Sequence, residues 1–257
     1  MHNLGAIQSA AMSQPANLGV LAFGDSITNG GGELQWGVAL QSWALWTARG
    51  LGLPYTGYAV DGARVADVVS AQIPAFEARA ARRDARYDVG CLYIGVNDVR
   101  GLDWDPAAFA AAFTEALRHL GARCERTLTM TAPLALGLPP AGPKVADLNA
   151  IIREAAAREG ALVVGLDDFG ARNQVMADRV HPTAFGQIAI ARRALAVLAD
   201  DGLPTRTDPA AMISYRTTRW GRLRGDATFA YRDLKLRTRG LVFRVGYRLR
   251  HRGERTG

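Results

Sequence analysis

The chain has 257 residues, of which 49% are hydrophobic, and this suits one α/β domain of roughly 200 residues with a further segment. It contains no run of about 18 apolar residues, so no transmembrane helix is predicted. The two cysteines form no Cys-x-x-Cys or Cys/His cluster, which argues against a zinc site and fits a reducing, cytoplasmic location.

The formal charge of +7 is unevenly distributed along the chain. Residues 201–257 hold 14 Lys and Arg against 5 Asp and Glu, a net charge of +9, which leaves −2 for residues 1–200. Residues 1–17 lack a basic cluster followed by an apolar core, so we interpret them as a leader and not as a secretory signal. Met12 is an alternative start.

The first predicted strand is the apolar run Val20–Phe23, which ends abruptly at Gly24-Asp25-Ser26. This pattern indicates a buried strand that delivers a serine to the edge of a sheet. A serine hydroxyl is a poor nucleophile alone and needs a base, a group that orients the base, and donors for an oxyanion. Asp25 is expected to brace the turn.

Residues 36–49 show helical spacing of three tryptophans, Trp36, Trp43 and Trp46, which predicts a helix over Trp36–Arg49. Core packing explains this spacing. For Trp36, which is nearest to Ser26 in the sequence, lining of an acyl pocket is the alternative.

The next two predicted strands, Tyr55–Val60 and Val89–Ile94, each end close to a residue that can donate a hydrogen bond. Gly62 lies at a strand-to-helix turn, where a backbone N–H can point outward. Asn97 follows the other strand and carries a side-chain amide. Taken singly, each is an ordinary turn or cap residue.

The rest of the chain continues the alternation of strands and helices, which predicts a parallel, doubly wound sheet with ligands at the carboxyl ends of its strands. The further predicted elements are a helical pattern that follows Arg64 and runs through Ala80, a helix from Asp105 to Leu120 with Asp105 as N-cap, a strand Thr127–Thr131, a loop Pro133–Pro143, a helix Lys144–Arg158 and a strand Ala161–Leu166.

A loop before the last helix of this pattern holds Asp178 and His181, with Pro182 following. A carboxylate at this spacing can bind one ring nitrogen of the histidine and leave the other to face a serine. Alone, the pair is more typical of a satisfied surface histidine. Asp167 and Asp168 are alternative acids, but the spacing favours Asp178.

Together, four segments resemble the SGNH hydrolases, also called the GDSL esterase/lipase family, over roughly residues 18–199. They are Gly24-Asp25-Ser26, Gly62, Gly95-x-Asn97-Asp98 and Asp178-x-x-His181, in the order of the family. The resemblance implies a flavodoxin-like three-layer α/β/α sandwich with about five parallel strands, assigned to residues 18–202. Ile27 stands where the family name has Leu.

The same resemblance implies the roles of the site residues. Ser26 is the expected nucleophile, His181 the base and Asp178 the acid that orients His181. The implied oxyanion donors are the backbone N–H groups of Ser26 and Gly62 and the side chain of Asn97. No metal or cofactor is expected.

The expected activity is that of a serine esterase acting through an acyl-enzyme on a carboxylic ester, whether a lipid, another acyl ester or an acetylated small molecule. An acyltransferase that uses an alcohol or sugar in place of water is the alternative. A non-catalytic binding protein on the same scaffold is a third hypothesis, against which the intact triad argues.

Residues 203–257 depart from the family pattern and form a basic extension. Alternation of apolar and mostly basic residues over Leu241–Leu249, with shorter alternating stretches over Thr228–Arg237, is consistent with a β-hairpin. Three roles are open: a solvated tail, docking on the main domain or a second copy, and contact with an anionic membrane surface. Nucleic-acid binding is not expected, because no reader motif accompanies the charge.

Overall fold

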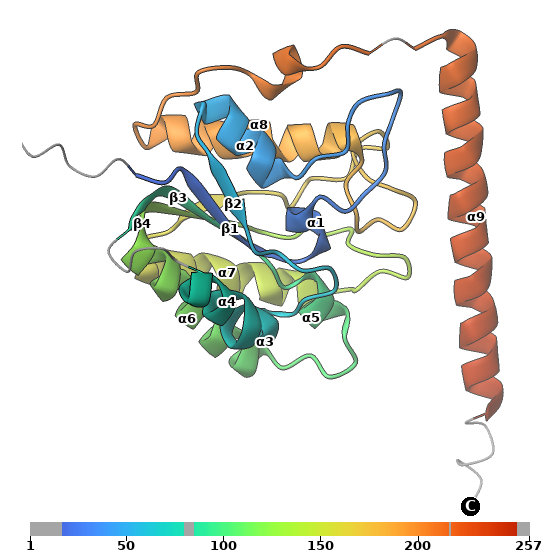
Figure 1. The fold of residues 1–257 in the computed structure, drawn as a ribbon. Coiled ribbons are helices and arrows are strands. Elements are labelled where there is room, and N and C mark those ends of the chain that lie inside the picture. Colours follow the sequence, from blue (N-terminus) through green and yellow to red (C-terminus); the bar gives the residue numbers. More distant parts are fainter. Residues whose placement is uncertain (1–16, 80–84, 216, 251–257) are drawn as a thin grey trace, which may run out of the picture.

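The computed structural model describes residues 17–79, 85–215 and 217–250, and Figure 1 shows their arrangement. A parallel five-stranded sheet in the order β2-β1-β3-β4-β5 forms its centre. The strands are β1 (Val20–Gly24), β2 (Tyr55–Gly57), β3 (Tyr87–Tyr93), β4 (Cys124–Met130) and β5 (Leu162–Val164).

Strands β1 and β3 are largely apolar because helices cover both faces of the sheet. All five residues of β1 are buried. Its register with β3 pairs Val20 with Val89 and Gly24 with Tyr93, so both strands end at the same edge. The strand order reverses between β1 and β3, where ligands bind in open parallel sheets.

Helices pack on the sheet from two sides (Figure 1), which confirms the predicted three-layer sandwich. Helices α2 and α8 cover one face, and α3, α4, α6 and α7 lie on the other. The helices of the sandwich are α1 (Ser26–Asn29), α2 (Trp43–Leu51), α3 (Val65–Asp67), the π-helix η1 (Val68–Gln72), α4 (Ile73–Arg79), α5 (Val96–Arg100), α6 (Pro106–Arg123), α7 (Lys144–Glu159) and α8 (Ala184–Asp200).

Capping residues fix where several of these helices begin. The Asp105 side chain accepts from the backbone N–H groups of Ala107 and Ala108, as expected of an N-cap before proline. The helix predicted over 36–49 instead begins at Trp43, because Ser42 caps it by accepting from the N–H of Leu45. Trp36 lies outside the helix with a φ of 49°.

The predicted β-hairpin is wrong, since the described part of the extension is one long helix, α9 (Arg219–Arg250), after a short 3₁₀ helix, η2 (Pro209–Met212). An isolated hairpin is marginal in water, whereas a helix satisfies its backbone hydrogen bonds internally. Within residues 219–238, its partly buried positions are Gly221, Phe229, Asp233 and Leu236, at helical spacing. Helix α9 runs beside the edge at which the strands end (Figure 1).

Two sequence predictions remain, one on the leader and one on membrane-spanning helices. Apart from residue 17, the expected leader lies outside the described residues. Among the helices that the structure describes, none combines the length and apolar character needed to cross a bilayer.

Candidate active site

Ser26 lies two residues after the end of β1, at the first position of α1, on a sharp turn. Gly24 makes this turn feasible: its φ is 154°, and a Cβ there would lie 2.5 Å from the carbonyl oxygen of Tyr93. Asp25 then caps α1, because one of its carboxylate oxygens accepts from the N–H of Ile27 at 2.9 Å. The turn therefore presents Ser26 at the carboxyl edge of the sheet.

Three side chains meet at this edge in one chain of hydrogen bonds. The Oγ of Ser26 lies 3.0 Å from Nε2 of His181, and Nδ1 of His181 lies 2.7 Å from Oδ2 of Asp178. The other carboxylate oxygen of Asp178 accepts from the backbone N–H groups of Val180 and His181, at 2.9 and 3.1 Å. The loop thus holds the acid and the histidine in fixed relation.

This geometry changes the proton affinity of both members of the pair. The hydrogen bond to Asp178 raises the pKa of His181, against the opposing effect of burial. Burial disfavours ionisation of Asp178, but hydrogen bonds from His181 and the Val180 N–H outweigh it and lower the pKa of the carboxyl. An ionised Asp178 orients the ring so that Nε2 faces Ser26.

The two further residues expected to donate to an oxyanion follow β2 and β3, the two neighbours of β1 in the sheet. Gly62 has a φ of 77°, which a side chain would strain. Asn97 lies in the first turn of α5, and its amide donates to the carbonyl oxygen of Ala63 at 3.0 Å. This bond ties Asn97 to the Gly62 loop.

A second carboxylate, Asp98, supports the same loop. It accepts from the N–H of Val65 through both oxygens, at 3.2 and 3.3 Å. The two turns that carry Gly62 and Asn97 are therefore held together by two side chains of one Asn-Asp pair.

Two buried glutamines that the sequence analysis did not single out brace the turn that carries Ser26. Gln72 accepts from the N–H of Gly24 and donates to its carbonyl oxygen, at 3.0 and 2.8 Å. Gln187 donates to the carbonyl oxygens of Ile27 and Gly31, at 3.0 and 3.1 Å. In the sequence, both glutamines could have been identified as polar residues on the otherwise apolar, buried face of a helix.

Asp25 is the most deeply buried carboxyl near the site. Only 1% of its surface is exposed, and its Oδ2 has no hydrogen-bond partner. Burial raises its pKa from 3.8 to about 7, although the Ile27 N–H and the nearby His181 act in the opposite direction.

The alternative acids are engaged elsewhere. Asp167 accepts from Thr131, Asn149 and Arg153, and Asp168 pairs with Arg193. Within the described residues, no three His, Cys, Asp or Glu side chains gather as metal ligands would.

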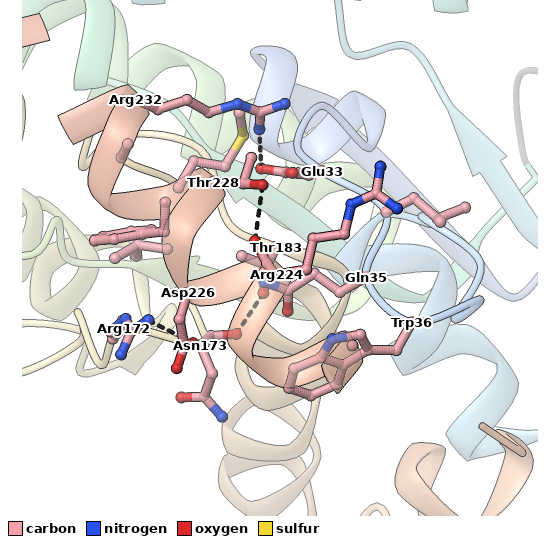
Figure 2. Close-up of a pocket in the computed structure, with 17 residues that line it drawn as sticks. Glu33, Gln35, Trp36, Arg172, Asn173, Thr183, Arg224, Asp226, Thr228 and Arg232 are labelled. Atoms are coloured by element: carbon pink, nitrogen blue, oxygen red, sulfur yellow. Dashed lines mark hydrogen bonds and ion pairs between the residues drawn. The ribbon is translucent and has the colours of Figure 1, made fainter. Parts of the chain in front are cut away.

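Beside the site, a cavity of about 410 Å³ separates the sandwich from α9 (Figure 2). Trp36 lines this cavity and packs on Phe185 and Tyr215, at ring-centroid distances of 5.3 and 6.2 Å. The cavity's lining also includes Ala177 and Thr183, which flank the loop of Asp178 and His181.

Helix α9 is held at this cavity by charged contacts. Arg232 pairs with Glu33 at 2.6 Å, and Arg172 pairs with Asp226 (Figure 2). The guanidinium of Arg172 also lies over the ring of Phe229, 5.4 Å from its centroid.

Comparisons with solved structures agree with this fold. An α/β hydrolase enzyme from the metagenome of Lake Arreo, Spain, superimposes with a TM-score of 0.56 at 21% identity, covering 72% of this chain and 96% of its own. An acetylxylan esterase from Geobacillus stearothermophilus gives 0.54 at 20% identity, with 71% and 96% covered. A lipolytic protein of the G-D-S-L family from Veillonella parvula gives 0.56 at 22% identity, with 70% and 97% covered.

Among curated proteins, none matches the sequence significantly. The model of the GDSL-like lipase/acylhydrolase family matches residues 22–188, which include Ser26, Gly62, Asn97, Asp178 and His181. The match spans well over half of the chain, and the folds agree. The chain therefore belongs to the GDSL-like lipase/acylhydrolase family.

Proposed function

We propose that this protein is a serine hydrolase of carboxylic esters, with Ser26 as nucleophile, His181 as general base and Asp178 as the acid that orients His181. The observation that carries the proposal is the continuous chain of hydrogen bonds from Ser26 through His181 to Asp178. Membership of an acylhydrolase family supports the reaction type.

The reaction proceeds in two halves. Nε2 of His181 takes the proton of Ser26 as Oγ attacks the ester carbonyl carbon, and the resulting imidazolium is stabilised by ionised Asp178. His181 then gives this proton to the departing alkoxide oxygen, so the alcohol leaves and an acyl-Ser26 ester remains. Water, deprotonated by His181, attacks that ester and releases the carboxylic acid and Ser26.

The negative charge on the tetrahedral oxygen needs donors that are in place before the reaction. The Ser26 and Gly62 backbone N–H groups and the Asn97 side chain are proposed to supply them, because the turns that carry them follow three adjacent strands. Each donor is worth about 10²–10³ in rate in comparable sites.

Hydrolysis of p-nitrophenyl esters, from acetyl to long-chain, tests the proposal with wild type and Ser26→Ala side by side. We expect turnover in the wild type and none above background in the variant. Ser70→Ala is a matched control, because Ser70 is exposed in η1 and its hydroxyl donates to the carbonyl oxygen of Ala66 in α3, at 2.8 Å. Equal turnover by wild type and Ser26→Ala would refute the assignment.

The same panel addresses the substrate. One structural neighbour is an acetylxylan esterase, so an acetylated substrate is one class to include. Addition of an alcohol or sugar acceptor, with product analysis, distinguishes hydrolysis from acyl transfer. The chain-length optimum then identifies the acyl group.

A further inference from the structure

The outward side of α9 carries large apolar side chains that nothing in the described structure covers. Trp220, Leu223, Tyr231 and Leu234 are 73%, 58%, 64% and 62% exposed. At helical spacing these four fall within about a quarter of the circumference of the helix, so they form one stripe. We call this set the α9 stripe.

The opposite side of the same helix faces the sandwich. Gly225, Thr228, Phe229 and Arg232 line the cavity shown in Figure 2, and Arg232 and Asp226 make the ion pairs that hold the helix there. Helix α9 is therefore fixed along one side, and the α9 stripe points away from the protein.

Basic residues border the α9 stripe on both sides. Arg219 and Arg237 follow one border, and Arg224 and Lys235 follow the other. From Arg219 to Arg250 the sequence has 10 Lys and Arg but 2 Asp. Both aspartates are paired with arginines, Asp226 with Arg172 and Asp233 with Arg237.

We propose that α9 binds an anionic lipid surface through the α9 stripe and the basic residues beside it. A helix that combines aromatic and aliphatic residues on one face with flanking cations lies in the plane of a bilayer interface. The ring systems of Trp220 and Tyr231 suit the headgroup region, the two leucines enter the acyl boundary, and the arginines bind lipid phosphates.

A second observation places further apolar side chains on the same side of the molecule. Val60, Leu102 and Leu134 are 54%, 104% and 54% exposed, and they lie on the connections that follow β2, β3 and β4. These connections emerge at the carboxyl edge of the sheet, beside which α9 runs (Figure 1). Exposed apolar residues thus gather where the triad lies.

The charge and the apolar residues of α9 together favour a lipid surface over two other partners, a second copy of the chain and nucleic acid. Pairing of two copies through α9 would bring two strongly basic helices together, and like charges at that separation repel. An anionic membrane complements the charge and accepts the apolar stripe at once. Nucleic acid would satisfy the arginines but leave the leucines in water.

Co-sedimentation of the full chain with phosphatidylcholine vesicles, with and without phosphatidylglycerol, tests the proposal. We expect binding that requires phosphatidylglycerol and weakens as salt is raised. Replacing the four residues of the α9 stripe with alanine, which preserves helix propensity, should weaken binding by at least about 100-fold. Leu18→Ala is the matched control, because Leu18 is 45% exposed at the opposite edge of the sheet, and it should bind as wild type.

If circular dichroism shows that the alanine variant has lost helix α9, a second variant, in which cations beside the stripe are neutralised, tests the proposal. Arg219→Gln with Lys235→Gln should weaken binding to anionic vesicles by about 30-fold, since each cation at an anionic surface contributes about a fivefold factor. Absence of vesicle binding, binding that both variants retain in full, or a dimer that forms through the stripe without vesicle binding would each overturn the proposal. Tight binding of single-stranded RNA without vesicle binding would overturn it as well.

Discussion

The sandwich and α9 differ in how many of their faces are covered by protein. Strands β1, β3 and β4 lie between two helix layers, and residues such as Leu21 and Leu128 are 0% exposed. Helix α9 touches the sandwich along one side, and its apolar residues Trp220 and Leu234 stand 73% and 62% exposed. The sandwich is therefore stabilised by its own core, whereas the outer face of α9 is available for a partner.

The largest effect is expected in the sandwich, from a substitution in the proposed triad. Asp178→Asn should lower kcat by about 10⁴, because the imidazolium loses its counter-charge and the ring its orientation. His181 must be neutral to act as base, so activity rises as pH rises through the pKa of His181. Since Asp178 raises that pKa, the variant's acid limb should shift to lower pH.

Steady-state kinetics across pH would measure both effects of Asp178→Asn. The control is Asp168→Asn, whose carboxylate pairs with Arg193 on the surface and should leave kcat unchanged. An equal loss in both variants would contradict the assignment of Asp178.

Asp25→Asn should change the pH dependence of folding stability. In the folded protein Asp25 keeps its proton up to about pH 7, whereas its ordinary pKa is 3.8. The folded state therefore binds more protons in this window, and the contribution of Asp25 to stability falls as pH rises through it, by up to about 4 kcal/mol. Urea unfolding from pH 4 to 8 should show this decline in wild type relative to the variant, and parallel profiles would contradict it.

Asn97→Ala should lower kcat by about 10²–10³ with little change in KM, because an oxyanion donor acts in the transition state. The variant also loses the hydrogen bond to Ala63, so its thermal midpoint should be measured in parallel. A change confined to KM would count against the oxyanion role.

The smallest effect is expected in the α9 stripe, and it is compared directly with a core substitution. Leu128→Ala should lower the free energy of unfolding by about 2–5 kcal/mol, since the site is fully buried in β4. Leu234→Ala should change it by less than about 0.5 kcal/mol, because the residue is mostly exposed. Denaturant titration measures the free energy of unfolding of both variants. Comparable decreases in the two would mean that α9 is packed like the core.

Burial also explains which parts of the structure the sequence could predict. The apolar pattern located all five strands but not their bounds: β2 ends at Gly57 and not at Val60, and β4 begins at Cys124 and not at Thr127. The predicted hairpin failed because alternation over Leu241–Leu249 is a local pattern, whereas helix α9 satisfies its backbone hydrogen bonds without a partner strand. The helix expected from Trp36 was misplaced because capping by Ser42 overrides the tryptophan spacing.

The candidate site was predictable to the level of its motif residues and no further. Ser26, Asp178 and His181 each sit in a recognisable turn, and the sheet brings them together. Gln72 and Gln187 lie 48 and 160 positions from the residues they brace, so only the folded chain reveals their hydrogen bonds.

Labelling with a fluorophosphonate tests whether Ser26 is a nucleophile activated by His181. We expect a single modification that peptide mapping places on Ser26, absent from Ser26→Ala and strongly slowed in His181→Ala. Labelling of another residue, or the absence of any labelling of folded wild-type protein, would contradict it.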